Sequence, residues 1–321
     1  MLTVLELFAG IGGCAEALRG LACPGQTHRV LACDISTLAV DVYRRNFAHE
    51  VMVRTLESLP DSDWDAFDAD LWWMSPPCQP YTLQGCRRDL ADARAAAFVS
   101  ILRQLPRRRP LHLAMENVPG FVGSQSHAAL LEVLSQSGYQ YREHVICPTE
   151  RGWPMRRRRY YLVASRGGPV REMARWDGLA RTLRSVLEPA WMVGEDDGDA
   201  AGKEARWKPP FPEDRLLERH RDRLHVLDLD DPLEVARCFT SAYGRSPLRS
   251  GSYLRVIDGG LRHLTPSEIL CLLGFTSEFR WPSTLSPRQA WSLAGNSLSI
   301  PVVRELIACL PGFDLLENSS A

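Results

Sequence analysis

The sequence lacks the features that mark exported, membrane-spanning and zinc-stabilised proteins. It has no run of the roughly 18 apolar residues that a transmembrane helix needs. Its first residues lack the basic segment that opens a secretory signal. Its 9 cysteines are scattered without a C-x-x-C pair, so neither a disulfide framework nor a zinc ribbon is expected. We therefore expect a cytoplasmic protein with no membrane partner and no metal.

Lysine is also scarce. Lys203 and Lys208 are the only lysines, so arginine carries nearly all of the positive charge. The formal net charge of −1 excludes a uniformly basic protein that coats nucleic acid, but it leaves room for a local basic cleft. The chain of 321 residues, of which 45% are hydrophobic, suffices for about two domains of roughly 150 residues each.

The first 165 residues alternate between short apolar runs and amphipathic helical segments. Such alternation is typical of βαβ units with right-handed crossovers and a mostly parallel sheet. The predicted strands cover residues 3–8, 29–33, 69–74, 111–115, 141–146 and 160–164, and the predicted helices cover 14–21, 38–47, 91–105 and 128–134. The sequence thus predicts an α/β fold with a doubly wound sheet.

The character of the sequence changes after residue 165. Periodicity is weak over residues 166–260, where an acidic stretch at 195–199 and the prolines of 208–212 oppose regular structure. We therefore predict one domain at residues 1–165 and a second, smaller lobe at 166–260.

Helical pattern returns in residues 261–321. Thr265, followed by Pro266 and Glu268, has the signature of a helix N-terminus with a capping box. A last helix is expected over residues 299–310. We predict that this C-terminal segment returns to the first domain.

Residues 8–15, F-A-G-I-G-G-C-A, form a glycine-rich turn between a predicted strand and a predicted helix. Gly10 and Gly12 fit G-x-G-x-x-G/A, with Ala15 in the last place, and such glycines let a ligand approach the backbone closely. Asp34 ends the next predicted strand, where a carboxylate can accept hydrogen bonds from ribose hydroxyls. The turn predicts a nucleoside-containing cofactor without separating NAD from S-adenosylmethionine. A glycine turn that binds nothing is the alternative.

Cys78 lies in S-P-P-C-Q-P-Y, residues 75–81, directly after a predicted strand. Ligands of α/β proteins bind at the carboxyl ends of strands, and the prolines on both sides stiffen the loop. A sulfur held in a rigid loop can act as a nucleophile. A small buried side chain is the commoner role of cysteine, and we expect it for the others.

Glu116 ends a further apolar strand, in M-E-N-V-P-G-F. Partial desolvation at this place should raise the pKa of its carboxyl, and a protonated carboxyl can donate a hydrogen bond to a ring nitrogen. Asn117 is placed to lock the loop that follows. A strand-end glutamate in water is the alternative.

Arg156, Arg157, Arg158 and Arg159 precede the strand at 160–164. Because side chains alternate along a strand, Arg157 and Arg159 share one face and could enter a cleft, while the other two face away. A solvated basic run is the alternative.

A last segment, A-G-N-S-L at 294–298, precedes the final predicted helix. The ordered series F-x-G-x-G, P-C-Q, E-N-V, R-x-R and G-N-S resembles the DNA cytosine-5 methyltransferase family. The C-F-T segment at 238–240 resembles a motif of the branch of this family that methylates the anticodon loop of tRNA(Asp). The chain departs from the family at Met155, where glutamine is usual, and we expect looser packing around Arg157.

This resemblance implies a Rossmann-like methyltransferase domain with a target-recognition lobe, S-adenosylmethionine as cofactor and S-adenosylhomocysteine as product. Cys78, as a thiolate, would attack C6 of cytosine, and Glu116 would hold N3 and the exocyclic amine. Arg159 and Arg157 would position the ring and lower the pKa of the Cys78 thiol. The implied catalytic residues are Cys78, Glu116, Arg157 and Arg159. The implied cofactor-binding residues are Phe8, Gly10, Ile11, Gly12, Asp34, Ile35, Leu56, Glu57, Pro76, Asn296 and Ser297.

The resemblance favours tRNA as the substrate. A DNA cytosine-5 methyltransferase, solitary or paired with a restriction enzyme, is the alternative, because the catalytic residues are shared. A catalytically idle nucleic-acid-binding protein is a third interpretation, which the intact motifs oppose. Arg237, Arg245, Arg249 and Arg255 are expected to contact phosphates, and Cys238 to be structural. We expect a monomer. Neither the tRNA nor its target cytosine can be named from the sequence.

Overall fold

The computed structural model describes residues 2–22, 28–81, 89, 95–192, 217, 219–255 and 260–315. The acidic stretch at 195–199, the prolines of 208–212 and the first residues of the helix predicted at 91–105 lie outside these ranges. Within them, no helix is long and apolar enough to cross a membrane.

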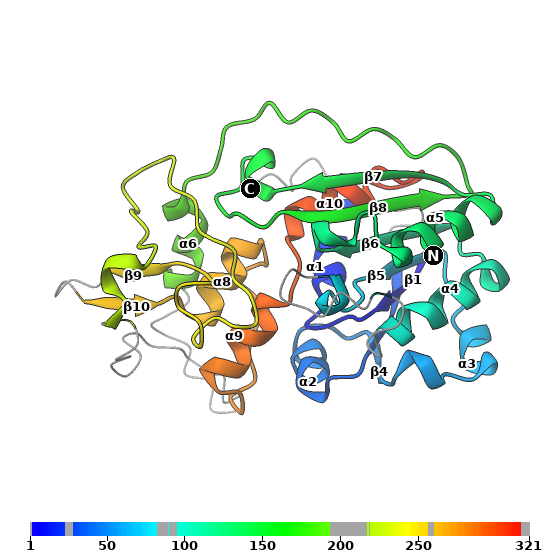
Figure 1. Cartoon of the computed structure of the whole chain (residues 1–321), viewed down its shortest axis with the longest axis horizontal. Coiled ribbons are helices and arrows are strands. Elements are labelled where there is room, and N and C mark those ends of the chain that lie inside the picture. The colour runs from blue at the N-terminus through cyan, green and yellow to red at the C-terminus, as the bar shows by residue number, and fades with distance from the viewer. Residues whose placement is uncertain are drawn as a thin grey trace.

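One large sheet organises the first half of the chain (Figure 1), with the strand order β4-β3-β1-β5-β6-β8-β7. Its strands are β1 (Leu2–Leu7), β3 (His28–Asp34), β4 (Glu50–Val53), β5 (Leu71–Met74), β6 (His112–Asn117), β7 (Gln140–Ile146) and β8 (Arg159–Ser165). The first five pair in parallel, whereas β8 runs antiparallel to both β6 and β7. The prediction of a mostly parallel sheet is confirmed; β4 was not predicted.

Helices cover both faces of this sheet (Figure 1). One face carries α1 (Gly13–Leu18), α2 (Thr37–Asn46) and α10 (Ile300–Ile307), and the other carries α3 (Asp61–Ala66), α4 (Ala96–Arg108) and α5 (Gln125–Gln136). Alternate strand residues fill the two cores: Trp73 of β5 packs with the first group and Trp72 with the second. A parallel sheet buried on both faces in this way is doubly wound. Short 3₁₀ turns complete the chain at Leu56–Ser58, Gln79–Tyr81, Pro119–Phe121, Pro148–Arg151 and Arg221–Arg223.

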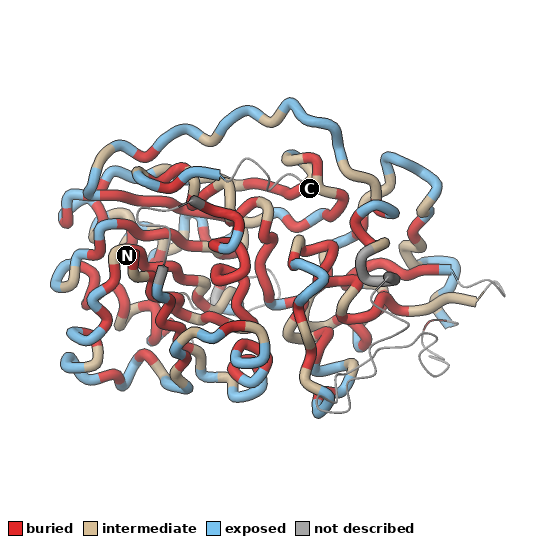
Figure 2. Tube along the Cα trace, turned by 180° about the vertical axis from the view of Figure 1, so that it is seen from behind, coloured by how far each residue is buried: buried red, intermediate tan, exposed pale blue. Residues whose placement is uncertain are grey.

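After β8 the chain leaves the sheet as an extended, largely exposed segment, residues 166–182 (Figure 2). It then enters a second lobe built from α6 (Leu183–Met192), β9 (Tyr253–Arg255), β10 (Leu261–His263), α8 (Pro266–Leu273) and α9 (Pro287–Gly295). The core on the α1 face of the sheet continues into this lobe through Phe239, Tyr243 and Trp291. One hydrophobic core therefore joins the two halves.

The C-terminal segment is divided between the two halves. Helices α8 and α9 lie in the second lobe, whereas α10 packs against α1, and β11 (Asp314–Leu315) pairs with β2 (Leu21–Ala22). The predicted capping box is confirmed, because the Thr265 hydroxyl accepts from the backbone N–H of Glu268, whose carboxylate accepts from that of Thr265.

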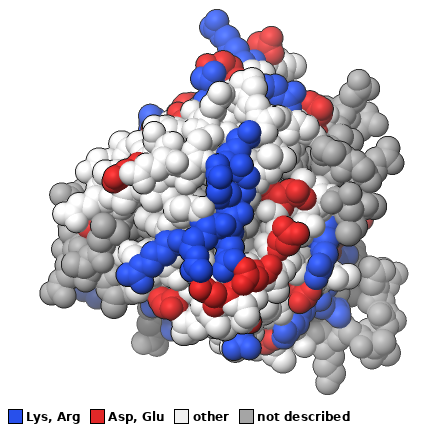
Figure 3. Space-filling model, turned by 90° about the vertical axis from the view of Figure 1, so that its right-hand side faces the viewer, with Lys and Arg blue, Asp and Glu red and all other residues white. Residues whose placement is uncertain are grey.

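Arginines and carboxylates adjoin on the face that carries α3 and α4 (Figure 3). Arg107 forms an ion pair with Asp61 at 2.9 Å, and Arg108 forms one with Asp65. The positive charges of Arg107 and Arg108 are thus paired with carboxylates of α3. Neither arginine lines the pocket described below.

Candidate active site

A cavity of about 1330 Å³ lies where the carboxyl ends of β1, β3, β5 and β6 face the second lobe. Each of the motifs singled out in the sequence contributes to its wall. All four predicted catalytic residues line it, as do all the predicted cofactor-binding residues except Gly12. Segments up to 290 positions apart in the chain, such as Phe8 and Leu298, share this wall, so folding brings the motifs into one site.

The glycine-rich turn forms one end of the cavity. Phe8, Gly10 and Gly12 all have positive φ values, of 57°, 56° and 92°, a conformation that favours glycine and is strained for phenylalanine. A Cβ added at Gly10 would meet nothing within 4 Å, so its backbone borders open space. Gly12 lies behind the turn, where a Cβ would come within 2.4 Å of the Phe47 ring. The absence of a side chain at Gly12 therefore lets Phe47 pack against the back of the turn.

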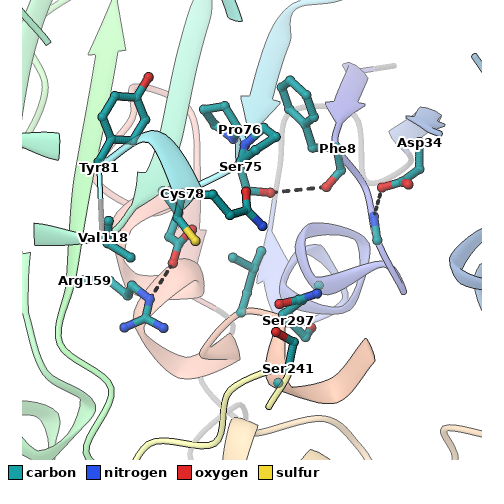
Figure 4. Close-up of a pocket in the computed structure, with 18 of the residues that line it drawn as sticks. Phe8, Asp34, Ser75, Pro76, Cys78, Tyr81, Val118, Arg159, Ser241 and Ser297 are labelled. Carbon is teal, nitrogen blue, oxygen red and sulfur yellow. Dashed lines mark hydrogen bonds and ion pairs between the residues drawn. The ribbon is translucent and has the colours of Figure 1, made fainter. Parts of the chain in front are cut away.

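Asp34, at the end of β3, is tied to the same turn (Figure 4). Its carboxylate accepts from the backbone N–H of Gly10 and of Ser36, both at 2.8 Å. Burial raises the pKa of this carboxyl, against the effect of the two hydrogen bonds. The next residue, Ile35, lines the cavity although its side chain is 72% exposed. An exposed apolar side chain beside a carboxylate fits the base and ribose of a nucleoside.

The Cys78 loop is braced from two sides. The Ser75 hydroxyl donates to the Phe8 carbonyl at 3.2 Å, and the Asn117 amide donates to the Pro76 carbonyl at 3.2 Å. The backbone N–H of Tyr81 donates to the Cys78 carbonyl at 2.9 Å. These bonds hold the sulfur between the glycine-rich turn and Arg159 (Figure 4), where the charges of Glu116 and Arg159 act on it.

Glu116 and Arg159 form an ion pair beside the sulfur, with 3.2 Å between Nε and Oε1 and only 12% and 15% of their side chains exposed. Burial raises the pKa of the Glu116 carboxyl, and the charges of Arg159 and Arg157 oppose the increase. The expectation of a raised pKa is confirmed in direction.

Burial is the largest cause that raises the pKa of the Cys78 thiol, and the negative charge of Glu116 raises it further. The charges of Arg159 and Arg157 lower this pKa. The arginines thus favour the thiolate, as expected, but they do not outweigh burial. The predicted effect of the two arginines is therefore confirmed in direction, but the pKa of the Cys78 thiol as a whole lies above its ordinary value because of burial.

This balance predicts the reactivity of Cys78 toward iodoacetamide. The thiolate is the reactive form, and its pKa lies above the ordinary 9.0. The rate of alkylation should therefore still increase with pH at pH 9. Mass spectrometry of the Cys78 peptide measures this rate. Removing the Arg159 charge by Arg159→Ala should raise the pKa further and slow alkylation about tenfold at pH 8. Arg158→Ala, which removes an exposed arginine paired with Glu150, is the matched control. An alkylation rate that levels off below pH 8 would contradict a raised pKa of the Cys78 thiol.

Arg157 is placed differently from Arg159. The guanidinium is buried, with 3% of the residue exposed, and it donates to the carbonyls of Phe239 at 3.0 Å, Gly295 at 3.2 Å and Ser297. Arg156 and Arg158 are exposed, so the predicted alternation of faces is observed. Arg157 touches the cavity, but most of its donors are used by backbone from two other segments. Met155, which was expected to loosen the packing around Arg157, is itself fully buried, whereas the Arg157 Nε is a buried atom without a hydrogen-bond partner among the described residues.

The lobe contributes residues that the motif analysis did not assign to the site. These are Thr240, Ser241, Ala242, Ser246 and Arg249, all of which line the cavity. The C-F-T segment was the available signal, because Thr240 is its last residue. Of the four lobe arginines expected to contact phosphate, only Arg249 reaches the wall. The Cys238 sulfur lies 3.8 Å from Arg157 Nη1 and 3.8 Å from Arg159 Nη2, and Cys238 does not line the cavity.

Comparison with known proteins gives one consistent result. Residues 2–182 match the family described as C-5 cytosine-specific DNA methylase. A human protein named tRNA (cytosine(38)-C(5))-methyltransferase is 30% identical, with 96% of this chain and 99% of that protein covered. A protein of the same name from Schizosaccharomyces pombe is 30% identical, with 96% of each covered. The solved structure of the Entamoeba histolytica methyltransferase EhMeth superposes with a TM-score of 0.82 at 25% identity, over 96% of this chain and 97% of that one. The chain belongs to the C-5 cytosine-specific DNA methylase family.

Proposed function

We propose that this protein transfers a methyl group from S-adenosylmethionine to C5 of a cytosine in the anticodon loop of tRNA. The observation that carries the proposal is the convergence of Cys78, Glu116 and Arg159 in the cavity that also holds the glycine-rich turn. The names of the human and fission-yeast relatives support tRNA as the substrate class.

The residues at the turn fit the proposed cofactor. Asp34 presents a carboxylate for ribose, Ile35 an exposed apolar surface for adenine, and Gly10 an open backbone position. Leu56, Glu57, Pro76, Asn296 and Ser297 complete this wall. S-adenosylmethionine, when bound, supplies an electrophilic methyl group and leaves as S-adenosylhomocysteine.

The protein's own residues prepare the cytosine. C5 of cytosine is a poor nucleophile, and formation of a bond between the Cys78 sulfur and C6 makes C5 electron-rich. Glu116 holds N3 and the exocyclic amine, and Arg159, paired with Glu116, orients the ring. After C5 has accepted the methyl group, it loses its proton to a base, the S–C6 bond breaks, and the C5–C6 double bond returns. Arg157 acts as a positioning residue, because its donors hold backbone.

The lobe that faces Cys78 would bind the nucleic acid. A base has to leave its stack to reach such a pocket, and a single-stranded loop makes this cheaper than a duplex does. We assign residues 1–165 to catalysis and cofactor binding and 166–260 to target recognition, with 261–321 completing both. We further propose that the protein is a cytoplasmic monomer.

Transfer of tritiated methyl groups tests the proposal, with total small RNA and genomic DNA offered in parallel. We expect label in tRNA and not in DNA, with transfer that weakens between 50 and 200 mM salt because phosphate contacts release counterions. Label in DNA alone would keep the chemistry and replace the substrate by that of the alternative, a DNA cytosine-5 methyltransferase. Label in neither would contradict methyl transfer itself.

A further inference from the structure

Glu6 is a buried carboxyl that the proposed chemistry does not use. It lies in β1, two residues before the glycine-rich turn, with 1% of the residue exposed. Its Oε1 accepts from the backbone N–H of Cys14, at the start of α1, at 2.9 Å. A carboxyl this deeply buried is expensive unless it is hydrogen-bonded, so the contact with Cys14 is a specific one.

The Glu6 contact closes the turn at one end, and Asp34 holds it in the middle. Between Glu6 and Cys14 the backbone passes through positive φ values at Phe8, Gly10 and Gly12. At Phe8, which is not a glycine, such a conformation persists only where surrounding contacts enforce it. Asp34 fixes the N–H of Gly10 and Glu6 fixes the N–H of Cys14, so two carboxyl groups define the shape of the turn.

A chain of hydrogen bonds extends from Glu6 to the outer part of the fold. Oε2 of Glu6 lies 3.1 Å from the hydroxyl oxygen of Tyr43, a buried residue of α2, and that oxygen lies 3.0 Å from Nδ1 of the partly exposed His49. The His49 ring stacks on Phe47 with 5.5 Å between centroids, and Phe47 packs directly against Gly12. The hydrogen-bonded chain therefore contacts the turn at two places, through Glu6 at Cys14 and through Phe47 at Gly12.

Burial and hydrogen bonding act in opposite directions on the Glu6 carboxyl. Burial raises the pKa of Glu6 to about 8, with smaller opposing effects from Cys14 and Tyr43 and a small increase from Asp34. The Tyr43 hydroxyl donates to Oε2 of Glu6 and lies within hydrogen-bond distance of Nδ1 of His49. The other oxygen of Glu6 accepts from Cys14. A glutamine at position 6 would keep the contact with Cys14 through its amide oxygen, and its amide N–H could donate to the Tyr43 oxygen once the Tyr43 hydroxyl turns to Nδ1 of His49.

We propose that Glu6 is a positioning residue for the cofactor turn, held by Tyr43 and His49, so that affinity for the cofactor depends on a chain that lies outside the pocket. None of the three side chains lines the cavity. The inference rests on the cofactor of the proposed function. It concerns how the turn is kept in its binding shape, whatever nucleic acid is methylated.

The test is the binding of S-adenosylhomocysteine by calorimetry to the full chain. Tyr43→Phe removes one hydroxyl and keeps the packed ring, and we expect the dissociation constant to increase about tenfold, the equivalent of about 1.4 kcal/mol. Tyr139→Phe is the matched control, because Tyr139 is also buried and donates to the Pro110 carbonyl at 2.5 Å, in the core on the opposite face of the sheet. It should lose similar stability and keep its affinity.

Rescue by the conservative variant separates positioning from general destabilisation. Glu6→Gln should bind S-adenosylhomocysteine within about threefold of the wild type, whereas Glu6→Leu should bind as weakly as Tyr43→Phe or more so. In methyl transfer, Tyr43→Phe should raise the KM for S-adenosylmethionine and leave kcat and the KM for RNA unchanged. Equal affinities of Tyr43→Phe, Tyr139→Phe and wild type would overturn the inference alone. A wild-type protein that does not bind S-adenosylhomocysteine would overturn the proposed function instead.

Discussion

Cys78→Ala is expected to lower methyl transfer by about 10⁴-fold or more, because loss of a nucleophile removes the covalent route rather than one contact among several. The sulfur lies in a braced loop beside the Glu116–Arg159 pair. Cys78 is partly exposed, so removing its thiol, which leaves the methyl group of alanine, costs little packing. The measurement is single-turnover transfer of tritiated methyl groups to tRNA, and S-adenosylhomocysteine binding should be unchanged in the variant.

The control for this prediction is a cysteine of the core. Cys271→Ala changes a buried residue of α8 that does not line the cavity, so activity should stay within about twofold while stability decreases by about 1 kcal/mol. If Cys78→Ala kept more than a hundredth of wild-type activity, another nucleophile would carry the reaction. Cys238→Ala would then be the next variant, since its sulfur lies beside both arginines.

The sheet could be predicted because its interior strands are mostly apolar and are followed by turn residues such as glycine, aspartate or proline. L-W-W-M of β5 is buried at every position, which is the pattern of a strand covered on both faces. The edge strand β4 was missed because E-V-M-V leaves two of its residues exposed, and a short, half-exposed run resembles a loop. The strands β2 and β11 have two residues each, too few for any periodic pattern.

The site could be predicted to the extent that its residues belong to motifs. The places of Cys78 and Glu116 follow from the parallel pairing of β5 and β6. Arg159 reaches the same edge because it begins β8, which runs antiparallel to β6. The sign of the change in the Cys78 pKa could not be predicted, because it depends on burial, and burial depends on packing between segments distant in sequence. The contacts of Arg157 were hidden for a related reason: its partners are backbone carbonyls, and side-chain patterns carry no information about them.

Those contacts predict that Arg157→Ala destabilises the protein as a whole. The substitution removes the guanidinium donor from the carbonyls of Gly295 and Ser297 and leaves the Phe239 carbonyl only the Cys238 thiol at 3.5 Å, and each buried carbonyl left unpaired costs about 1–3 kcal/mol. We expect the free energy of unfolding, measured by urea denaturation, to decrease by at least about 3 kcal/mol. Ser297 lines the cavity, so affinity for S-adenosylhomocysteine should decrease as well.

Arg158→Ala supplies the matched control for Arg157→Ala, because Arg158 is the exposed neighbour and its partner Glu150 is 49% exposed. Its effect on stability should stay within about 0.5 kcal/mol. Arg157→Lys should recover little stability, since one ammonium group cannot reach carbonyls that a planar fork of donors spans. A decrease below about 1 kcal/mol for Arg157→Ala would mean that water replaces the guanidinium. Arg157 would then have no structural role that the fold requires, and it would again be a candidate for direct contact with the base.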